Sequence, residues 1–373
     1  MTETTDSLNK DIFNYKCWFI TAILIVGYTY MHVQLTGLYD GVPLESWLNF
    51  TAPLPFGQRQ LVPFLARCLY KSTTLKPYEI FFILEFIFVV FTFFALQTLL
   101  QLEFGEQLAL LLTWLFFLLL PLCTIINYRF VIDGQAAIFW PYDTPSLFFI
   151  ILSFYLTLKE KWLWLAVCIF FATLNRESSI LLVLLIPALY LRSLKNFYKL
   201  ILPFLLSLSA YILARLGTYL LAVNLAGAYT EWYHGSAITN FAINMYWLFA
   251  KQGILMFIFA FAGLPLLWFG FYDYIPLKYR PIRYLTFLYF LGLLGVGLVA
   301  EARIFAEIVA LIYLPVCLAI TNWLQGKQIV ETQPKRFMYY LNRYLIVLLL
   351  ILIPMSSKFI DYTIKQWIPV SSE

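Results

Sequence analysis

The chain has 373 residues, of which 62% are hydrophobic and only 12% are charged, and its formal net charge is +5. Its mean hydropathy is +0.81. A soluble domain of this size with so few charged side chains could not solvate its surface, so the composition excludes an ordinary soluble enzyme. It predicts an all-α, polytopic membrane protein, a bundle of transmembrane helices for which the lipid bilayer is both solvent and partner.

Metal, nucleotide and disulfide chemistry have no motif in this sequence. The five cysteines, at positions 17, 68, 123, 168 and 317, are scattered and mostly lie inside apolar runs. Such spacing is typical of small buried side chains and not of a disulfide framework or a zinc site. A DxD triplet, HExxH, GxGxxG and a P-loop are all missing from the sequence. We therefore expect no cofactor, no metal site and no nucleic-acid partner.

Apolar runs long enough to be membrane-spanning helices recur along the whole chain, and we count about eleven of them. They cover residues 13–34, 78–100, 107–126, 143–158, 162–174, 178–191, 200–222, 253–272, 284–300, 304–323 and 340–356. The first run has no A-x-A-like cleavage site, so it is interpreted as a retained helix. We expect one transmembrane domain over 1–373, with a candidate catalytic module at 13–222 and further spans at 223–373 that complete a cleft.

The basic residues predict the direction of these spans. Short clusters of Lys and Arg lie at 159–161, 192–199, 278–283 and 327–343. With eleven spans and a cytoplasmic N-terminus, all four clusters fall on the cytoplasmic side, as the positive-inside rule requires. The loops at the opposite ends of the spans then face the exterior.

A pair of adjacent charges interrupts the apolar stretch 162–191. Arg176 and Glu177 lie in "LNRESSILL", where burying a charge in hydrocarbon is costly without a partner, water or a function. Two helices that meet at Asn175–Ser179 would keep the clusters 159–161 and 192–199 on one side. Because 162–174 is too short to cross about 30 Å of hydrocarbon, this pair is expected to line a wet cavity that opens outward.

The first external segment, about 35–77, holds three further candidates. Asp40 follows the first span in "LYDG", where it is either an ordinary turn residue or a general base. Glu45 is either solvated or supports the site. The stretch 58–71 has one apolar face and predicts a helix lying along the membrane surface. Arg59, near its start, is either part of that surface or a phosphate ligand.

Later external segments supply the remaining candidates. Asp143 in "WPYDTPS" either caps the fourth span or belongs to the substrate site. His234 is either an exposed loop residue or a substrate contact, and His32 is expected at the membrane interface. In "EARIFAE", Arg303 and Glu307 are four residues apart and could form a local ion pair. Alternatively this segment, which also carries Glu301, supplies partners for Arg176 and Glu177.

These features resemble the GT-C superfamily of integral-membrane glycosyltransferases. The resemblance is carried by Asp40 in "LYDG", by the loop helix around "RQLVPFLAR", and by "WPYDTPS" and "LNRESSILL", and it covers most of 13–323 as architecture more than as sequence. Many members carry a paired acidic motif in the first external loop, whereas this chain has Asp40 alone with Glu45 five residues later. Either carboxylate could therefore be the base.

The resemblance implies a sugar donor linked to a polyprenyl phosphate. We expect transfer of the sugar, with inversion, to a hydroxyl of a glycan, lipid or protein acceptor on the non-cytoplasmic side. Asp40 would be the base, and Arg59, Arg176 and Arg303, with Asp143 and His234, would bind substrate, supported by Glu45, Glu177 and Glu301. Aromatic side chains would offer stacking platforms for sugar rings. The expected location is a bacterial inner membrane, with the site facing the periplasm or exterior.

Two other functions stay open at this point. An O-antigen polymerase or ligase would also use external arginines, with a lipid-diphosphate donor. A transporter or flippase for lipid-linked sugars often contains broken helices near the middle of the membrane, and the break at 175–179 fits that description.

Overall fold

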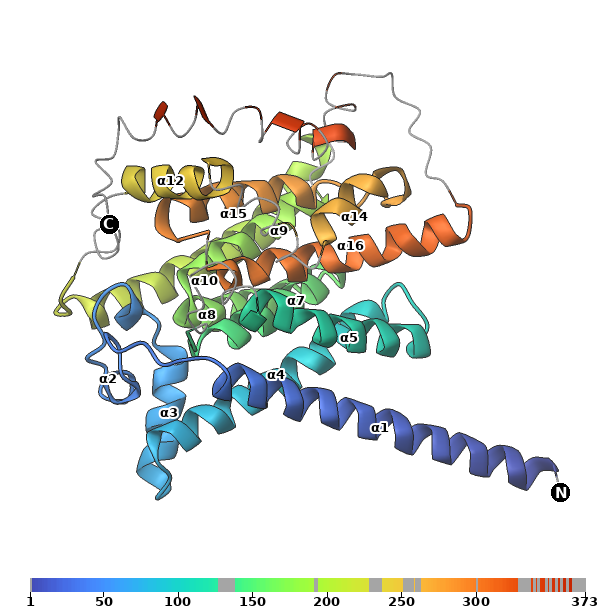
Figure 1. Cartoon of the computed structure of the whole chain (residues 1–373), viewed down its shortest axis with the longest axis horizontal. Helices are drawn as coiled ribbons and strands as arrows, with labels where there is room; N and C mark the ends of the chain where they lie inside the picture. Colours follow the sequence, from blue (N-terminus) through green and yellow to red (C-terminus); the bar gives the residue numbers. More distant parts are fainter. Residues whose placement is uncertain are drawn as a thin grey trace.

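The computed structural model describes residues 2–126, 138–190, 194–227, 237–250, 258, 263–299 and 301–327, with scattered residues between 337 and 363. Within these ranges the regular elements are helical, and the only strand-like feature is an isolated parallel bridge between Gly37 and Ile138. The expected all-α class is therefore confirmed for this part of the chain. Figure 1 shows the course of the helices.

Several helices follow the predicted apolar runs, but α1 begins eleven residues before the run 13–34 and α10 begins six residues before the run 200–222. The α-helices are α1 (Thr2–Gln34), α2 (Leu44–Leu48), α3 (Leu61–Ser72), α4 (Pro77–Leu100), α5 (Glu106–Pro121), α7 (Asp143–Leu158), α8 (Trp162–Asn175), α9 (Ile180–Tyr190), α10 (Leu194–Ala222), α12 (Ala237–Met245), α14 (Leu264–Gly270), α15 (Ile282–Val296) and α16 (Ala306–Leu324). Short 3-10 or π turns are η1 (Phe56–Gln58), η2 (Leu122–Ile126), η3 (Glu177–Ser179), η4 (Tyr246–Ala250), η5 (Tyr272–Tyr274) and η6 (Ala302–Phe305).

Five helical segments are long and apolar enough to cross a membrane, which fits a multi-pass integral membrane protein. They are Tyr15–Gln34, Pro77–Leu100, Glu106–Ile126, Tyr198–Ala222 and Ala302–Leu324. Four shorter apolar helices accompany them: Asp143–Leu158, Trp162–Asn175, Glu177–Tyr190 and Ile282–Val296. About half of 253–272 and about half of 340–356 lie outside the described residues. The count of about eleven spans and their direction stay predictions.

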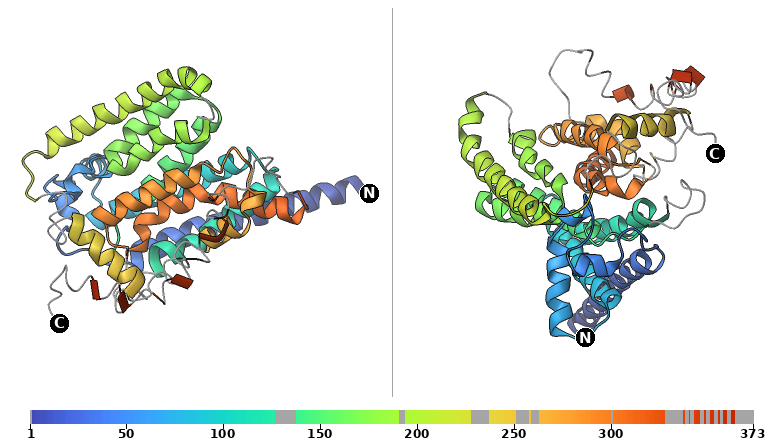
Figure 2. Two further views of the ribbon diagram at one scale, coloured as in Figure 1. Left: turned by 90° about the horizontal axis from the view of Figure 1, so that it is seen from above. Right: turned by 90° about the vertical axis from the view of Figure 1, so that its left-hand side faces the viewer.

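Helix α7 is the centre of the bundle. It packs against α4, α8, α9 and α16, and three quarters of its residues are buried. Figure 2 shows α8–α10 on one side of the molecule, α14–α16 on another, and α1 with α4 on a third. Two hydroxyl groups of α7 bond back along the chain: Ser146 donates to the Tyr142 carbonyl and Thr157 donates to the Ser153 carbonyl.

A buried polar contact joins α1, α4 and α7. His32 was expected at the membrane interface but is fully buried in the protein. Its Nδ1 lies 2.8 Å from Glu85 Oε1, and Thr144 donates to the same oxygen at 2.5 Å. Since Thr144 follows Asp143, this contact fixes the N-terminal end of α7, where the site begins.

The segment after α1 forms the expected loop helix. Helix α3 buries Val62, Pro63 and Ala66, while Phe64 is 57% exposed. In Figure 1 it runs steeply across the direction shared by α1, α5 and α16. The helix predicted within 58–71 is present as α3, which begins three residues later at Leu61. Its position on a membrane surface stays a prediction.

Candidate functional site

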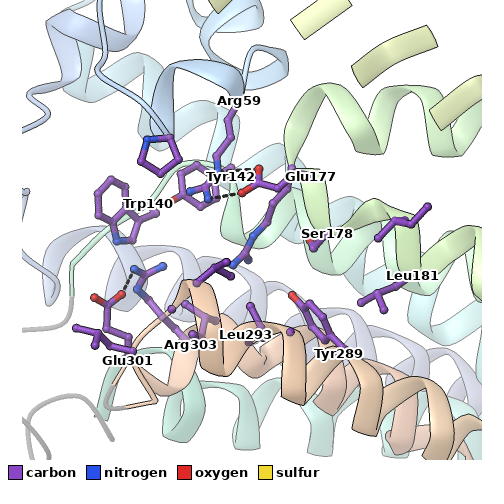
Figure 3. A pocket seen from close by; sticks show the side chains of 18 of the residues that line it. Arg59, Trp140, Tyr142, Glu177, Ser178, Leu181, Tyr289, Leu293, Glu301 and Arg303 are labelled. Carbon is purple, nitrogen blue, oxygen red and sulfur yellow. Dashed lines mark hydrogen bonds and ion pairs between the residues drawn. The ribbon is translucent and has the colours of Figure 1, made fainter. Parts of the chain in front are cut away.

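Charged side chains from four distant parts of the chain converge beside the N-terminal end of α7, and Figure 3 labels Arg59, Glu177, Glu301 and Arg303 among them. They come from the turn before α3, from the start of α7, from the break between α8 and α9, and from the segment around η6. They are Arg59, Asp143, Arg176, Glu177, Glu301, Arg303 and Glu307, which we term the charged cluster. Most are less than one tenth exposed.

The break between α8 and α9 presents Arg176 and Glu177 to this cluster. Helix α8 ends at Asn175 and Arg176 adopts an extended conformation, with φ −158° and ψ 139°. The Asn175 amide donates to the Tyr142 carbonyl at 3.0 Å and to Ser146 Oγ at 2.9 Å. These bonds tie the end of α8 to the start of α7. The predicted helix boundary at 175–179 is confirmed.

An aromatic wall borders the cluster. Phe139 N–H donates to the Gly37 carbonyl at 2.8 Å, which places the segment after α1 beside residues 138–142. Trp140 stacks on Phe56 with 4.5 Å between ring centroids and an interplanar angle of 10°. The Arg303 guanidinium carbon lies 5.3 Å from the centroid of the Trp140 ring. Because Phe56 and Arg303 already contact this indole, Trp140 is not an open platform on which a sugar ring could stack.

Arg59 is held between a carboxylate and two aromatic rings. Its Nη2 lies 2.9 Å from Glu177 Oε1, and its Nε donates to Oε2 at 3.3 Å. The guanidinium carbon is 4.0 Å from the Tyr142 ring centroid and 5.6 Å from that of Phe56. Burial alone would lower the pKa of Arg59, but the Glu177 carboxylate reverses that effect and the pKa is raised. Arg59 therefore stays charged although it is buried.

Burial raises the pKa of the neighbouring Tyr142 phenol to about 12. Tyr142 is accordingly neutral at physiological pH, and it faces two cations: the Arg176 guanidinium carbon also lies 5.7 Å from its ring centroid. A neutral ring between two guanidinium groups keeps them close without adding a charge.

Arg176 takes its partners from α7 and α16. Its Nη1 lies 3.2 Å from Glu307 Oε1 and 3.6 Å from Asp143 Oδ1. Glu307 also accepts from Ser178 Oγ at 3.0 Å and from the Tyr289 hydroxyl. The expectation that the "EARIFAE" segment supplies a partner for Arg176 is confirmed, whereas Glu177 finds its partner in Arg59.

Arg303 pairs with Asp143 and Glu301. Its Nη1 donates to Asp143 Oδ2 at 2.7 Å, and its Nη2 donates to Glu301. The local pair between Arg303 and Glu307 is not formed. Asp143 is the first residue of α7 and the helix has Tyr142 at its N-cap position, with no side-chain cap. The capping role considered for Asp143 is therefore wrong, because its carboxylate is used by two arginines.

A cavity of about 360 Å³ lies beside the cluster. Its polar wall includes Arg59, Trp140, Tyr142, Arg176, Glu177, Glu301 and Arg303. Its apolar wall comes mainly from α9 and α15 and includes Leu181, Leu184, Leu288, Leu293 and Val296. The cavity is thus charged along one part and aliphatic along another, as a site for an amphipathic molecule requires.

Two residues that line the cavity each have a buried donor nitrogen without a partner among the described residues. The two nitrogens are Trp140 Nε1 and Arg303 Nε. Trp140 is 1% exposed and Arg303 is 5% exposed. Because leaving a buried donor unpaired is costly, such groups indicate an acceptor that a ligand or water supplies.

The structure separates the predicted site residues into three groups. Six of them meet in the charged cluster: Arg59, Asp143, Arg176, Glu177, Glu301 and Arg303. Asp40 and Glu45 are exposed and do not line the cavity. Asp40 follows Tyr39, whose ring centroid is 5.7 Å from that of Trp140. His234 lies outside the described residues.

Sequence reasoning missed several members of the site. Trp140 and Tyr142 stood inside the quoted segment "WPYDTPS" but had no role assigned to them. Tyr289 lies in an apolar run without any polar neighbour that could mark it. Asn244 donates to the carbonyls of Leu294 and Gly297 and accepts from Val299 N–H, which supports the turn before Glu301. No signal in the sequence indicates that contact.

The charges of the cluster are closely matched. Within the part of the chain that the structure describes, three arginines face four carboxylates, namely Asp143, Glu177, Glu301 and Glu307. Among the described residues, no group of three or more His, Cys, Asp or Glu side chains is placed to hold a metal ion. The polar groups on the wall of the described cavity are guanidinium and carboxylate groups, the indole of Trp140, the phenols of Tyr142 and Tyr289, the Ser178 hydroxyl and the Asn240 amide.

No protein-family model, curated protein or solved structure matches this chain. The resemblance to membrane glycosyltransferases is consequently an expectation from the sequence. Any function has to be argued from the side chains of the site.

Proposed function

We propose that the protein is a membrane glycosyltransferase that takes its sugar from a polyprenyl phosphate. The observation that carries this proposal is a single cavity in which Arg59, Arg176 and Arg303 adjoin an aliphatic wall built by α9 and α15. Guanidinium groups recognise phosphate oxygens through paired hydrogen bonds. Aliphatic side chains accommodate a lipid tail. A lipid-linked phosphate combines the two chemistries in one molecule.

The matched charges favour a donor with one phosphate over a donor with two. A polyprenyl-phosphate sugar is a phosphodiester with a single negative charge. A diphosphate donor would bring more negative charge against the four carboxylates of the cluster, and each further charge is repelled in a site of low dielectric. The charge of the cluster therefore favours the proposed transferase over an O-antigen polymerase or ligase that uses lipid diphosphates.

The proposed reaction is an inverting displacement. The acceptor hydroxyl attacks the anomeric carbon from the face opposite the phosphate, the bond from that carbon to the phosphate oxygen breaks, and polyprenyl phosphate leaves. Asp40 takes the acceptor proton as general base. Arg59, Arg176 and Arg303 stabilise the charge that develops on the leaving phosphate. Glu177, Glu301 and Asp143 hold these arginines in position.

The placement of Asp40 is compatible with meeting an acceptor and not with binding the donor. It is exposed and lies outside the cavity wall, one residue from Tyr39, which contacts Trp140. A base in that position would act on a hydroxyl that arrives from the solvent side. Glu45, also exposed, is the alternative base in the same loop.

A carrier of lipid-linked sugars is the second candidate function. The break between α8 and α9, with charges at the broken ends, is a feature of many transporters. The cavity chemistry alone fits both a carrier and a transferase, because each has to bind the same lipid.

Turnover separates the two functions. The purified protein would be reconstituted in liposomes with a polyprenyl phosphate carrying a radiolabelled sugar, together with candidate acceptors. A labelled glycosidic product supports the transferase, and relocation of unchanged lipid between leaflets supports the carrier. If label is neither transferred nor relocated and the protein does not bind the lipid, the proposed function is wrong.

A further inference from the structure

We infer that Trp140, Glu301 and Arg303 form the subsite that holds the sugar of the donor, and that this subsite selects an uncharged sugar through its hydroxyl groups. The inference rests on the proposed function, since it names the part of the same cavity that binds the sugar. The main role of Arg303 is then to bind the sugar, and its contribution to binding the phosphate is secondary.

The three residues form one corner of the cavity. Arg303 Nη2 donates to Glu301, and the Arg303 guanidinium carbon lies 5.3 Å from the Trp140 ring centroid. All three side chains line the cavity, and none is more than 5% exposed. Figure 3 shows them grouped together at one end of the pocket.

This corner contains donors that require an acceptor. Within the described residues, Trp140 Nε1 and Arg303 Nε have no hydrogen-bond partner. The other guanidinium nitrogens of Arg303 are used by Asp143 and Glu301. A ligand oxygen is therefore the group that this corner is built to receive.

The local charge decides which kind of oxygen fits. Arg303 faces two carboxylates, Asp143 and Glu301, so the corner carries no excess of positive charge. A carboxylate on the sugar would be repelled by them. An ammonium group on the sugar has no lone pair, so it could not accept a hydrogen bond from Trp140 Nε1 or Arg303 Nε. A hydroxyl accepts from an N–H group and also donates to a carboxylate, so neutral sugar hydroxyls satisfy both requirements.

The order of groups along the cavity matches the order of groups in the donor. In Figure 3, Leu181 and Tyr289 lie at the end opposite Trp140 and Glu301, and the pair Arg59–Glu177 lies between the two ends. A polyprenyl-phosphate sugar has its lipid tail, phosphate and sugar in that sequence. With the tail along α9 and α15 and the phosphate near Arg59, the sugar reaches the corner of Trp140, Glu301 and Arg303.

The first test compares binding of bare and glycosylated lipid. The probes are undecaprenyl phosphate and undecaprenyl phosphate carrying glucose, galactose, N-acetylglucosamine or arabinose, with affinities measured on the purified protein in detergent. Trp140→Phe removes the indole donor and keeps an aromatic ring. We expect it to weaken binding of the best glycosylated probe by about tenfold, the usual effect of one lost hydrogen bond to a ligand. Binding of bare undecaprenyl phosphate should change by less than about twofold.

Trp268→Phe is the matched control. Trp268 is 4% exposed and its Nε1 also has no partner within the described residues, but it lies outside the cavity wall. The Trp268→Phe variant should bind bare and glycosylated undecaprenyl phosphate with unchanged affinity. An equal loss for bare and glycosylated lipid in Trp140→Phe would assign this corner to the phosphate and overturn the inference. No loss for any probe would overturn it as well.

The second test concerns the charge on the sugar. Wild-type protein should bind undecaprenyl phosphate carrying glucuronic acid at least about tenfold more weakly than the glucose probe. Glu301→Gln should narrow that difference, because it removes one of the two carboxylates. If the wild type prefers the glucuronic acid probe, the assignment to an uncharged sugar is wrong. If it binds neither bare nor glycosylated lipid, the proposed function itself fails.

Discussion

The buried pair of Arg176 and Glu307 offers the most direct test of how the charged cluster is held together. Glu307 is 2% exposed and Arg176 is 7% exposed, with 3.2 Å between Nη1 and Oε1. At an effective dielectric constant of about 20, charges at that distance attract each other by about 5 kcal/mol. Most of this offsets the cost of burying the two charges, so the net stabilisation is much smaller than the cost of removing one partner.

The two single substitutions should each destabilise the protein. Glu307→Gln leaves Arg176 with Asp143 alone, 3.6 Å away, and that carboxylate also binds Arg303 at 2.7 Å. Arg176→Met leaves the Glu307 carboxylate buried without a cation. We expect each to lower the free energy of unfolding by about 2–3 kcal/mol, at or just below the usual cost of breaking a buried pair. In both variants an uncompensated charge stays inside the bundle.

The double variant Arg176→Met with Glu307→Gln should recover much of that loss, because it leaves neither charge unpaired. We expect a coupling energy of at least about 1.5 kcal/mol. Neutral hydrogen bonds between membrane helices average about 0.6 kcal/mol. A coupling energy above about 1.5 kcal/mol would therefore indicate an ion pair and not a neutral hydrogen bond. Unfolding in mixed detergent and dodecyl sulfate, followed by tryptophan fluorescence, gives the four free energies.

The pair of Glu103 and Lys278 is the control for this cycle. Its side chains are 22% and 44% exposed, so its coupling should stay below about 1 kcal/mol. A coupling for Arg176 and Glu307 no larger than that of the control would refute the view that buried charge holds the α8–α9 break against α16.

Three further outcomes are expected. Asp40→Asn should abolish sugar transfer while Glu45→Gln retains it and both proteins fold, as judged by product formation and gel filtration; near-normal turnover in Asp40→Asn would remove Asp40 from the mechanism. Glu85→Leu should cost about 2–3 kcal/mol of unfolding free energy because it leaves Thr144 without its acceptor, whereas Glu85→Gln, which keeps an acceptor, should cost less than half of that. Asn244→Ala should cost about 1–3 kcal/mol because it leaves backbone groups of the turn before Glu301 unpaired; equal stability to wild type would contradict that role.

The helices were predictable because their apolar runs end at polar or helix-breaking residues. The run predicted at 143–158 coincides with α7 (Asp143–Leu158), and the run at 162–174 coincides with α8 except for its last residue. Length and composition identify such elements even when their direction across the membrane is unknown. The break at 175–179 was also predictable, because two unpaired charges in the middle of an apolar helix would be costly.

The partners of the charged residues were less predictable. A spacing of four residues puts Arg303 and Glu307 on one face only if both lie in an α-helix. Arg303 instead lies in the 3-10 turn Ala302–Phe305, whose tighter winding changes the direction of its side chain. It therefore meets Asp143 and Glu301, and Glu307 is left for Arg176. Sequence spacing contains no information about that change of winding.

Stability alone does not account for the charged cluster. Buried ion pairs can often be replaced by apolar side chains of similar volume with no loss of stability, because desolvation of the charges cancels most of their attraction. This chain nevertheless buries three arginines and three carboxylates in one place, with Glu177 half-buried beside them. The adjoining cavity is lined by two residues whose donor nitrogens have no partner within the described residues. Such an arrangement keeps guanidinium groups oriented before a ligand arrives, and the orientation is what a binding or catalytic site requires. The carboxylates that hold the arginines also limit how much negative charge the ligand can carry, which is why a singly charged lipid phosphate with a neutral sugar fits this cavity better than a diphosphate or an acidic sugar.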